Sequence, residues 1–120
     1  TAQEVEDNTS TTTYVSPGRA GRHPSAAKVW CSIAATGALE TNGSFNCTTT
    51  DTGPGDRTIN FTTSFATGTP YNGTLGNHAA SNGDVRYQIG TRAAGSIRVI
   101  MQLGTTATDL EHDHIFCGDQ

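Results

Sequence analysis

Two histidines near the end of the chain are the residues whose type and spacing most clearly suggest chemistry. They belong to the run His112-Asp113-His114, inside a segment, Leu110–Cys117, that has the pattern of a β-strand. Residues two positions apart on a strand project to the same side, so the two imidazoles would point the same way. Imidazole nitrogen is a common ligand of transition metals. The alternative is a solvated strand face without a metal, covered at its ends by Leu110 and Phe116.

A second group of residues has the composition of a sugar-contact surface. The group lies in the loop-rich segment Phe65–Asp84 and at the start of the strand predicted over Val85–Thr91. An aromatic ring can stack on a sugar while amides and a carboxylate hydrogen-bond its hydroxyl groups. The alternative is that these are ordinary loop residues. The candidate contact residues are Tyr71, Asn72, Asn77, His78, Asn82, Asp84 and Tyr87.

Catalytic motifs are missing from the sequence. The patterns G-x-S-x-G, H-E-x-x-H and the P-loop do not occur. The carboxylates of Glu40, Asp51, Asp56 and Glu111 cannot be paired from the sequence as a glycosidase couple. We therefore expect a protein without enzymatic activity.

Composition and charge exclude two further classes of function. Charged residues make up 15% of the 120 residues and the formal net charge is −4, whereas an average soluble domain is about 25% charged. Because no Lys/Arg cluster exists, the chain lacks the counter-charge that nucleic-acid binding requires. No apolar run approaches the roughly 18 residues of a membrane span, so we do not expect membrane insertion.

The chain contains three cysteines, Cys31, Cys47 and Cys117. An odd number argues against a complete disulfide framework. We favour buried free thiols for Cys31 and Cys47, which would act as small hydrophobic residues. A bridge between these two remains the alternative.

Alternation of apolar and polar residues with a period of two predicts an all-β domain. In the central stretch Gly43–Thr63, two strands flank a turn at Asp51–Asp56 that contains the Gly and Pro residues a chain reversal needs. On the first of these strands, Phe45, Cys47 and Thr49 would share one face. Thr36–Asn42 is expected to be a loop. The seven predicted strands are Ala26–Ala35, Gly43–Thr50, Arg57–Thr63, Tyr71–Asn77, Val85–Thr91, Ser96–Leu103 and Leu110–Cys117.

Seven short strands at this spacing predict an antiparallel β-sandwich or barrel-like domain over residues 26–120. Residues 1–25 are polar and cannot bury enough apolar surface to fold alone, which predicts an extended or linker segment. Trp30 and Ile100 lie opposite the aliphatic rows of their own strands, so each requires a cover from another layer or another chain.

The chain contains, in this order, the motifs Ala26-Ala27-Lys28-x-Trp30, Ser44-Phe45-Asn46, Asp51-x-Gly53-x-Gly55-Asp56 and Thr58-x-Asn60-Phe61-Thr62. This order resembles the tip domains at the C-terminus of bacteriophage tail fibres. Gln3-Glu4-Val5 and Tyr14-Val15-Ser16-Pro17 resemble a fibre-shaft unit, and Phe116-x-Gly118-Asp119 resembles the closing motif of the family. Residues 64–110 carry no motif of the family.

The resemblance implies a homotrimeric attachment protein of the virion tail that works outside the cell without catalysis. Its expected partners are a host-surface glycan or protein and other phage tail proteins, and the candidate sugar-contact residues would then touch the receptor. A trimer would cover Trp30 and Ile100. His112 and His114 of three chains would supply about six nitrogens to an iron-like transition metal on the threefold axis. The alternatives are a structural virion component, such as a head fibre or decoration protein, and a secreted lectin-like adhesin.

Overall fold

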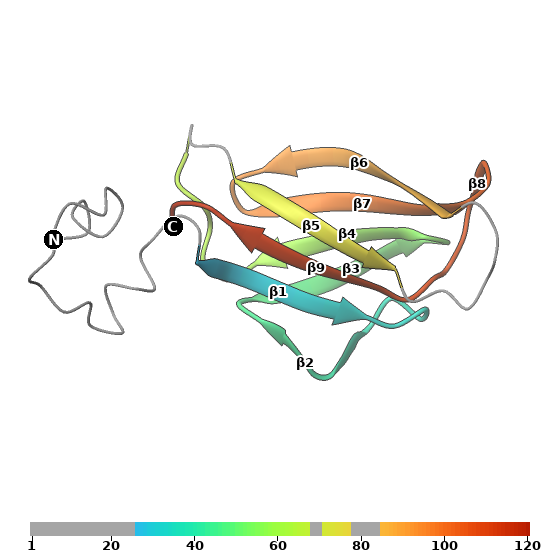
Figure 1. The fold of residues 1–120 in the computed structure, drawn as a ribbon, viewed down its shortest axis with the longest axis horizontal. Coiled ribbons are helices and arrows are strands. Elements are labelled where there is room, and N and C mark those ends of the chain that lie inside the picture. The colour runs from blue at the N-terminus through green and yellow to red at the C-terminus, as the bar shows by residue number, and fades with distance from the viewer. Residues whose placement is uncertain (1–25, 68–70, 78–84) are drawn as a thin grey trace, which may run out of the picture.

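The computed structural model describes residues 26–67, 71–77 and 85–120, which form two antiparallel β-sheets packed as layers of a sandwich (Figure 1). One sheet has the strand order β2-β1-β9-β5, and the other has the order β3-β4-β7-β6 with β8 paired to β7. The strands are β1 (Ala27–Ile33), β2 (Leu39–Phe45), β3 (Cys47–Gly53), β4 (Asp56–Phe61), β5 (Asn72–Asn77), β6 (Val85–Ala93), β7 (Ser96–Leu103), β8 (Thr106–Ala107) and β9 (His112–Cys117).

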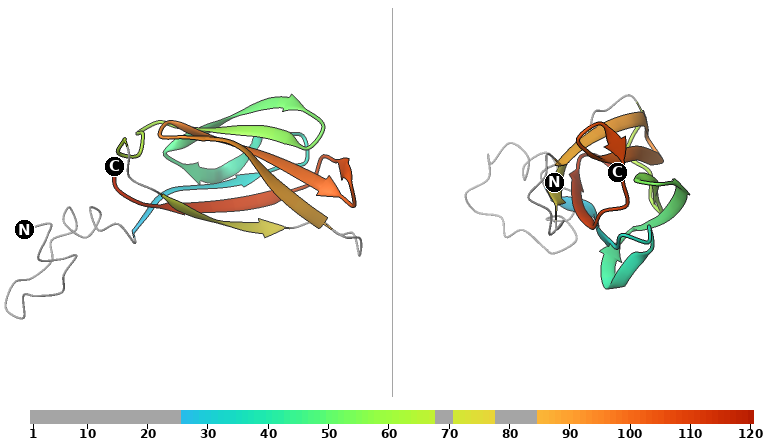
Figure 2. Two further views of the ribbon diagram at one scale, coloured as in Figure 1. Left: turned by 90° about the horizontal axis from the view of Figure 1, so that it is seen from above. Right: turned by 90° about the vertical axis from the view of Figure 1, so that its right-hand side faces the viewer.

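The predicted all-β class is confirmed, and the architecture is a sandwich whose two sheets do not close into a barrel among the described strands. Figure 2 shows the layers from two further sides. The described residues contain nine strands instead of the seven predicted. The predicted linker over residues 1–25 lies outside the described residues. Among those that are described, no helix has the length and apolarity needed to cross a bilayer.

The core lies between the sheets and is built by the alternating strands. On β7 the residues Ile97, Val99 and Met101 are buried, as the sequence pattern predicts, and β7 has the predicted bounds. Each such side chain stabilises the fold by about 1.5–3 kcal/mol when it is fully buried. The buried apolar residues are Val29, Cys31, Ile33, Cys47, Ile59, Phe61, Phe65, Tyr71, Ile97, Val99, Met101 and Phe116.

The chain passes from one sheet to the other at Asn46, and this corrects two predictions. The predicted single strand Gly43–Thr50 is divided between β2 and β3, and the predicted loop Thr36–Asn42 already contains the start of β2 at Leu39. Asn46 has a φ of 60°, in the left-handed region that Asn tolerates better than most residues. Because the strand is interrupted there, Phe45 and Cys47 do not share a face: Phe45 is exposed, whereas Cys47 is buried.

The Asn46 side chain holds this crossing in place. Its Nδ2 donates to the carbonyl of Lys28 at 3.0 Å, and its Oδ1 accepts from the backbone N–H of Thr63 at 2.8 Å. These bonds tie the crossing to β1 in one sheet and to the chain just after β4 in the other. On this side of the sandwich, the chain connects the edge strand β2 of one sheet directly to the edge strand β3 of the other.

The cysteines are free thiols, and both Cys31 and Cys47 are buried, as the favoured interpretation predicted. The two thiols face each other from β1 and β3. A hydrogen bond between them raises the pKa of Cys31, which burial raises further, and the same bond lowers the pKa of Cys47. The Cys47 thiol also lies 3.6 Å from the carbonyl oxygen of Trp30.

A buried arginine is the feature of the core that the alternating pattern failed to predict. Arg57 shares the inward face of β4 with Ile59 and Phe61 and is only 2% exposed. Its guanidinium pairs with Asp51 and Asp109 at 2.8 Å each. It also donates to the carbonyl oxygens of Gly53 and Ala35. One polar residue thus connects the β3–β4 turn with the segment before β9.

Candidate functional site

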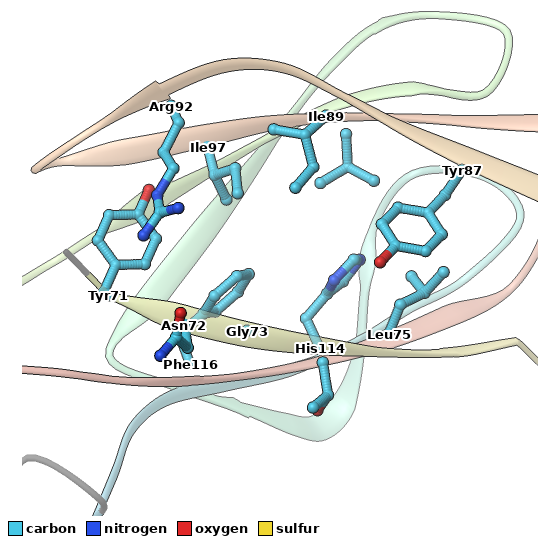
Figure 3. A pocket seen from close by; sticks show the side chains of 12 residues that line it. Tyr71, Asn72, Gly73, Leu75, Tyr87, Ile89, Arg92, Ile97, His114 and Phe116 are labelled. Carbon is cyan, nitrogen blue, oxygen red and sulfur yellow. The ribbon is translucent and has the colours of Figure 1, made fainter.

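A cleft opens between the two edge strands β5 and β6, on the side of the sandwich opposite the Asn46 crossing (Figure 3). The cavity has a volume of about 140 Å³. Its walls come from β5 and β6, and its floor comes from buried residues of β7 and β9. The lining residues are Tyr71, Asn72, Gly73, Thr74, Leu75, Tyr87, Ile89, Arg92, Ile97, Val99, His114 and Phe116.

A β-bulge in β6 determines which side chains face the cleft. Tyr87 and Ile89 stand opposite the inward-facing residues of β7, and the register shifts after Ile89. Arg92 then stands opposite the buried Ile97. A strictly alternating strand would have put Arg92 on the other face from Ile89, because the two are three positions apart. The bulge therefore turns Arg92 towards the cleft, as bulges beside binding sites often do.

Tyr71 lies at the wall of the cleft but belongs mainly to the core. It is only 4% exposed, and its ring stacks on Phe65 with 4.4 Å between the centroids. The Arg92 guanidinium lies 4.3 Å from the centre of the Tyr71 ring. The Tyr71 hydroxyl donates to the carbonyl oxygen of Ala93 at 3.0 Å, and burial raises the pKa of Tyr71. The ring is therefore packed by the protein, and we assign it a supporting position instead of direct stacking on a ligand.

The other candidate contact residues are placed differently from one another. Asn72 and Tyr87 line the same cleft from opposite sheets, and both are exposed, Tyr87 by 49%. Asn77 is the last residue of β5. The remaining candidates, His78, Asn82 and Asp84, lie outside the described residues.

Sequence reasoning missed Arg92 and Ile89 as members of this site. Ile89 is 48% exposed, although the alternation of β6 places it on the same face as Val85 and Tyr87, which the sequence pattern predicts to be buried. Its exposure follows from the position of β6 at the edge of its sheet, which a sequence pattern does not reveal. The short run Gly90-Thr91-Arg92 inside a strand was the available signal, since Gly within a strand often marks a bulge.

His112 and His114 point between the sheets and are only 1% and 4% exposed. The solvated strand face considered from the sequence is therefore wrong. His112 Nδ1 and His114 Nε2 lie 2.7 Å apart, so one imidazole donates to the other. The His114 ring also stacks on Phe116 in the floor of the cleft. Burial foremost lowers the pKa of His112 to about 4 and that of His114 to about 3.

Buried neutral imidazoles have the protonation state that a metal requires. Within the described part of the chain, however, no three His, Cys, Asp or Glu side chains come together as a metal-binding group. A metal shared between chains at His112 and His114 stays a prediction.

Searches against protein-family models, curated proteins and solved structures found no match to this chain.

Proposed function

We propose that this chain is a bacteriophage tail-fibre tip domain that attaches the virion to a glycan or protein on the host surface without catalysis. Its place would be the phage tail, where it acts outside the cell. The motif resemblance supplies the class of protein. The observation that carries the attachment role is the cleft between β5 and β6, because Asn72 and Tyr87, two residues chosen from the sequence as receptor contacts, line it together.

The chemistry of the cleft suits recognition. Tyr87 offers an exposed aromatic ring, Ile89 and Leu75 add apolar surface, and the Arg92 guanidinium offers hydrogen-bond donors. Sites of this kind combine an apolar lining with a few polar groups that orient the ligand. Among the described lining residues, none has a carboxylate that could serve as a hydrolytic acid or nucleophile, which fits binding better than glycoside hydrolysis.

Tyr87→Ala is expected to weaken adsorption of the chain to host cells about 5- to 150-fold, because an exposed ring that stacks on a ligand contributes about 1–3 kcal/mol. The melting temperature should change by only a few degrees, since half of this side chain is exposed. Adsorption of the labelled chain to a panel of bacterial strains, with thermal unfolding alongside, measures both effects.

Gln88→Ala is the matched control for that experiment, because Gln88 is the next residue on β6 and faces away from the cleft. Equal adsorption of Tyr87→Ala and the unmodified chain would place the receptor contact elsewhere. Tyr71→Ala is unsuitable as a test, since removing a buried aromatic ring typically costs about 3–5 kcal/mol of stability.

We also propose that the domain is a homotrimer. Three large apolar side chains lie exposed in one cross-strand row on the outer face of the β2-β1-β9-β5 sheet: Phe45 is 54% exposed, Trp30 is 39% and Ile115 is 48%. The register pairs Trp30 with Phe45 on one side and with Ile115 on the other. Ile100, the second residue for which we predicted a cover, is half-buried and lies between Asp56 and Gln88.

Light scattering of the purified chain should return three times the mass of 12.5 kDa. Trp30 is the only tryptophan, so its emission should shift to longer wavelength when dilution dissociates the trimer. The variant Trp30→Gln/Ile115→Gln is expected to be a folded monomer because it removes most of the apolar row. A stable monomer of the unmodified chain at micromolar concentration would exclude the trimer.

The same exposed row would serve a structural virion component that binds other virion proteins and no receptor. Binding to host cells by the isolated chain separates the two functions. A chain that forms trimers but adsorbs to no strain would favour the structural role.

A further inference from the structure

We propose that the β5–β6 cleft selects a sugar that carries a carboxylate or a phosphate group, with Arg92 as the anion-binding residue and Tyr87 as the platform for the sugar ring. This inference rests on the attachment function proposed above and names the class of ligand for that site.

The charge of the cleft comes from Arg92. None of the described residues that line it is Asp or Glu. The ion pairs among the described residues engage Arg57 and Arg98, and within this part of the chain Arg92 has no carboxylate partner. The whole chain carries a formal net charge of −4. A cationic group in a cleft whose described lining contains no carboxylate, on an otherwise acidic protein, favours an anionic ligand at that position.

Arg92 is held in a defined position by its contact with Tyr71. The guanidinium lies over the ring, 4.3 Å from its centre, and the ring is fixed by Phe65 on the core side and by a hydroxyl contact to the backbone at Ala93. A guanidinium that stacks through its face keeps N–H donors along its edge, and this planar fork matches a carboxylate or phosphate. The arrangement reduces the side-chain entropy that ligand binding would otherwise lose.

The cleft has two chemically different ends, which gives a ligand an orientation. Figure 3 shows Arg92 above Tyr71, near Asn72, at one end, and Tyr87 beside Leu75 at the other, with Ile89 between them. The volume of about 140 Å³ is well below the roughly 300–1,000 Å³ of sites for drug-sized ligands. One sugar ring with its anionic group at the Arg92 end fits this size and polarity.

The test compares three probes on the full chain by two-dimensional NMR: methyl glucuronide, glucose 6-phosphate and neutral methyl glucoside. At least one anionic probe should bind about tenfold more tightly than methyl glucoside and shift the backbone amides of Asn72, Tyr87 and Arg92. The carboxylate and phosphate probes identify which anion the cleft prefers. Equal affinities for the neutral probe and both anionic probes would overturn the inference.

Arg92→Gln should remove this preference, so that the affinity for the anionic probes falls to that for methyl glucoside. Arg86→Gln is the matched control, because it removes the same charge from β6 on the face away from the cleft, opposite Gln102. Arg92→Lys keeps the charge without the planar fork and should retain only part of the preference, which provides a second test if Arg92→Gln disturbs the packing of Tyr71. A preference that persists in Arg92→Gln would overturn the role of Arg92.

Adsorption to host cells distinguishes failure of this inference from failure of the proposed function. If the unmodified chain adsorbs and Arg92→Gln adsorbs equally well, the attachment function stands and the anionic ligand is excluded. If the unmodified chain adsorbs to no strain and binds no probe, both proposals fail.

Discussion

Replacing Arg57 with methionine is expected to lower the free energy of unfolding by about 3 kcal/mol. Arg57 is 2% exposed and binds two carboxylates and several backbone carbonyl oxygens. Methionine has a similar length but no donors, so the carbonyl oxygens of Ala35 and Gly53 would lose their partner. Chemical denaturation monitored by fluorescence of Trp30 measures the change.

The expected loss of stability depends on how far the carboxylate partners of Arg57 are exposed to water. The side chains of Asp51 and Asp109 are about half exposed, so water can solvate them when the guanidinium is removed. Asp109 also accepts the backbone N–H of Gly55, and this bond, followed by Arg57, lowers the pKa of its carboxyl group. Arg57 Nε is buried without a hydrogen-bond partner among the described residues, which already subtracts from the stabilisation. These facts place the expected loss at the lower end of the range for broken buried ion pairs.

Arg98→Met is the matched control, because Arg98 lies on the neighbouring strand β7 and pairs with Asp56 on the exposed face. Exposed ion pairs contribute little, so we expect a much smaller change. Arg57→Lys should recover only part of the lost stability, since an ammonium group cannot span two carboxylates and two carbonyl oxygens in one plane. Equal destabilisation by Arg57→Met and Arg98→Met would show that the buried network has no special importance.

The sequence predicted those strands in which one face is buried and the chain runs without interruption. β7 has the predicted bounds, and β4 and β9 differ from their predictions mainly at the ends. In such strands the period of two is imposed by burial, so the pattern is visible without a structure. The central hairpin was predicted for the same reason, with Gly and Pro marking its turn.

Asn46 shows why the rest of the fold was missed. The residues on both sides of it alternate as if they formed one strand, but its left-handed backbone sends Phe45 and Cys47 into different sheets. That conformation is stabilised by bonds to Lys28 and Thr63, which are distant in the sequence. A local pattern contains no information about such partners.

Only part of the candidate site was predicted, because the direction of a side chain depends on contacts that a local pattern does not contain. Tyr87 and Asn72 were identified from their side-chain types, and both line the cleft. Arg92 was missed because the bulge in β6 reverses its direction, and Tyr71 was given a contact role although its ring is packed in the core. Side-chain chemistry can be read from a sequence, whereas the direction of each side chain depends on register.

Acid is expected to destabilise the domain between pH 6.5 and about 4 through His112 and His114. Their folded-state pKa values are lowered to about 4 and about 3, whereas an unfolded histidine has a pKa near 6.5. Over this range the unfolded chain binds protons that the folded chain does not, so stability is full above pH 6.5 and falls as the pH decreases. Each histidine contributes at most about 1.4 kcal/mol per pH unit, so lowering the pH from 7 to 5 should cost about 2–4 kcal/mol in total.

The cause of the depressed pKa values lies in the packing around the pair. Burial is the largest contribution for both histidines. The positive charge of Arg57 further lowers the pKa of His112, and a positive charge on His112 would further lower the pKa of His114. The negative charge of Asp113 raises both pKa values. The 2.7 Å hydrogen bond between the rings also requires an acceptor nitrogen, which protonation would remove. Asp56 and Asp109 have lowered pKa values, so protonation of their carboxyl groups also destabilises the fold in acid, but only below about pH 4.

Urea denaturation at pH 7.5, 6.0 and 5.0 measures this effect in the unmodified chain and in His112→Leu/His114→Leu. The double variant should show a much flatter dependence on pH over this range, whatever its stability at pH 7.5, because leucine binds no proton. A chelator distinguishes buried histidines from a metal site: a stability at pH 7.5 that is indifferent to chelator assigns the acid sensitivity to burial alone. A loss of stability with chelator at neutral pH, together with about one transition-metal ion per three chains, would instead support the metal predicted from the sequence. Equal pH dependence in the double variant and the unmodified chain would show that the two imidazoles are protonated in the folded state as readily as in water.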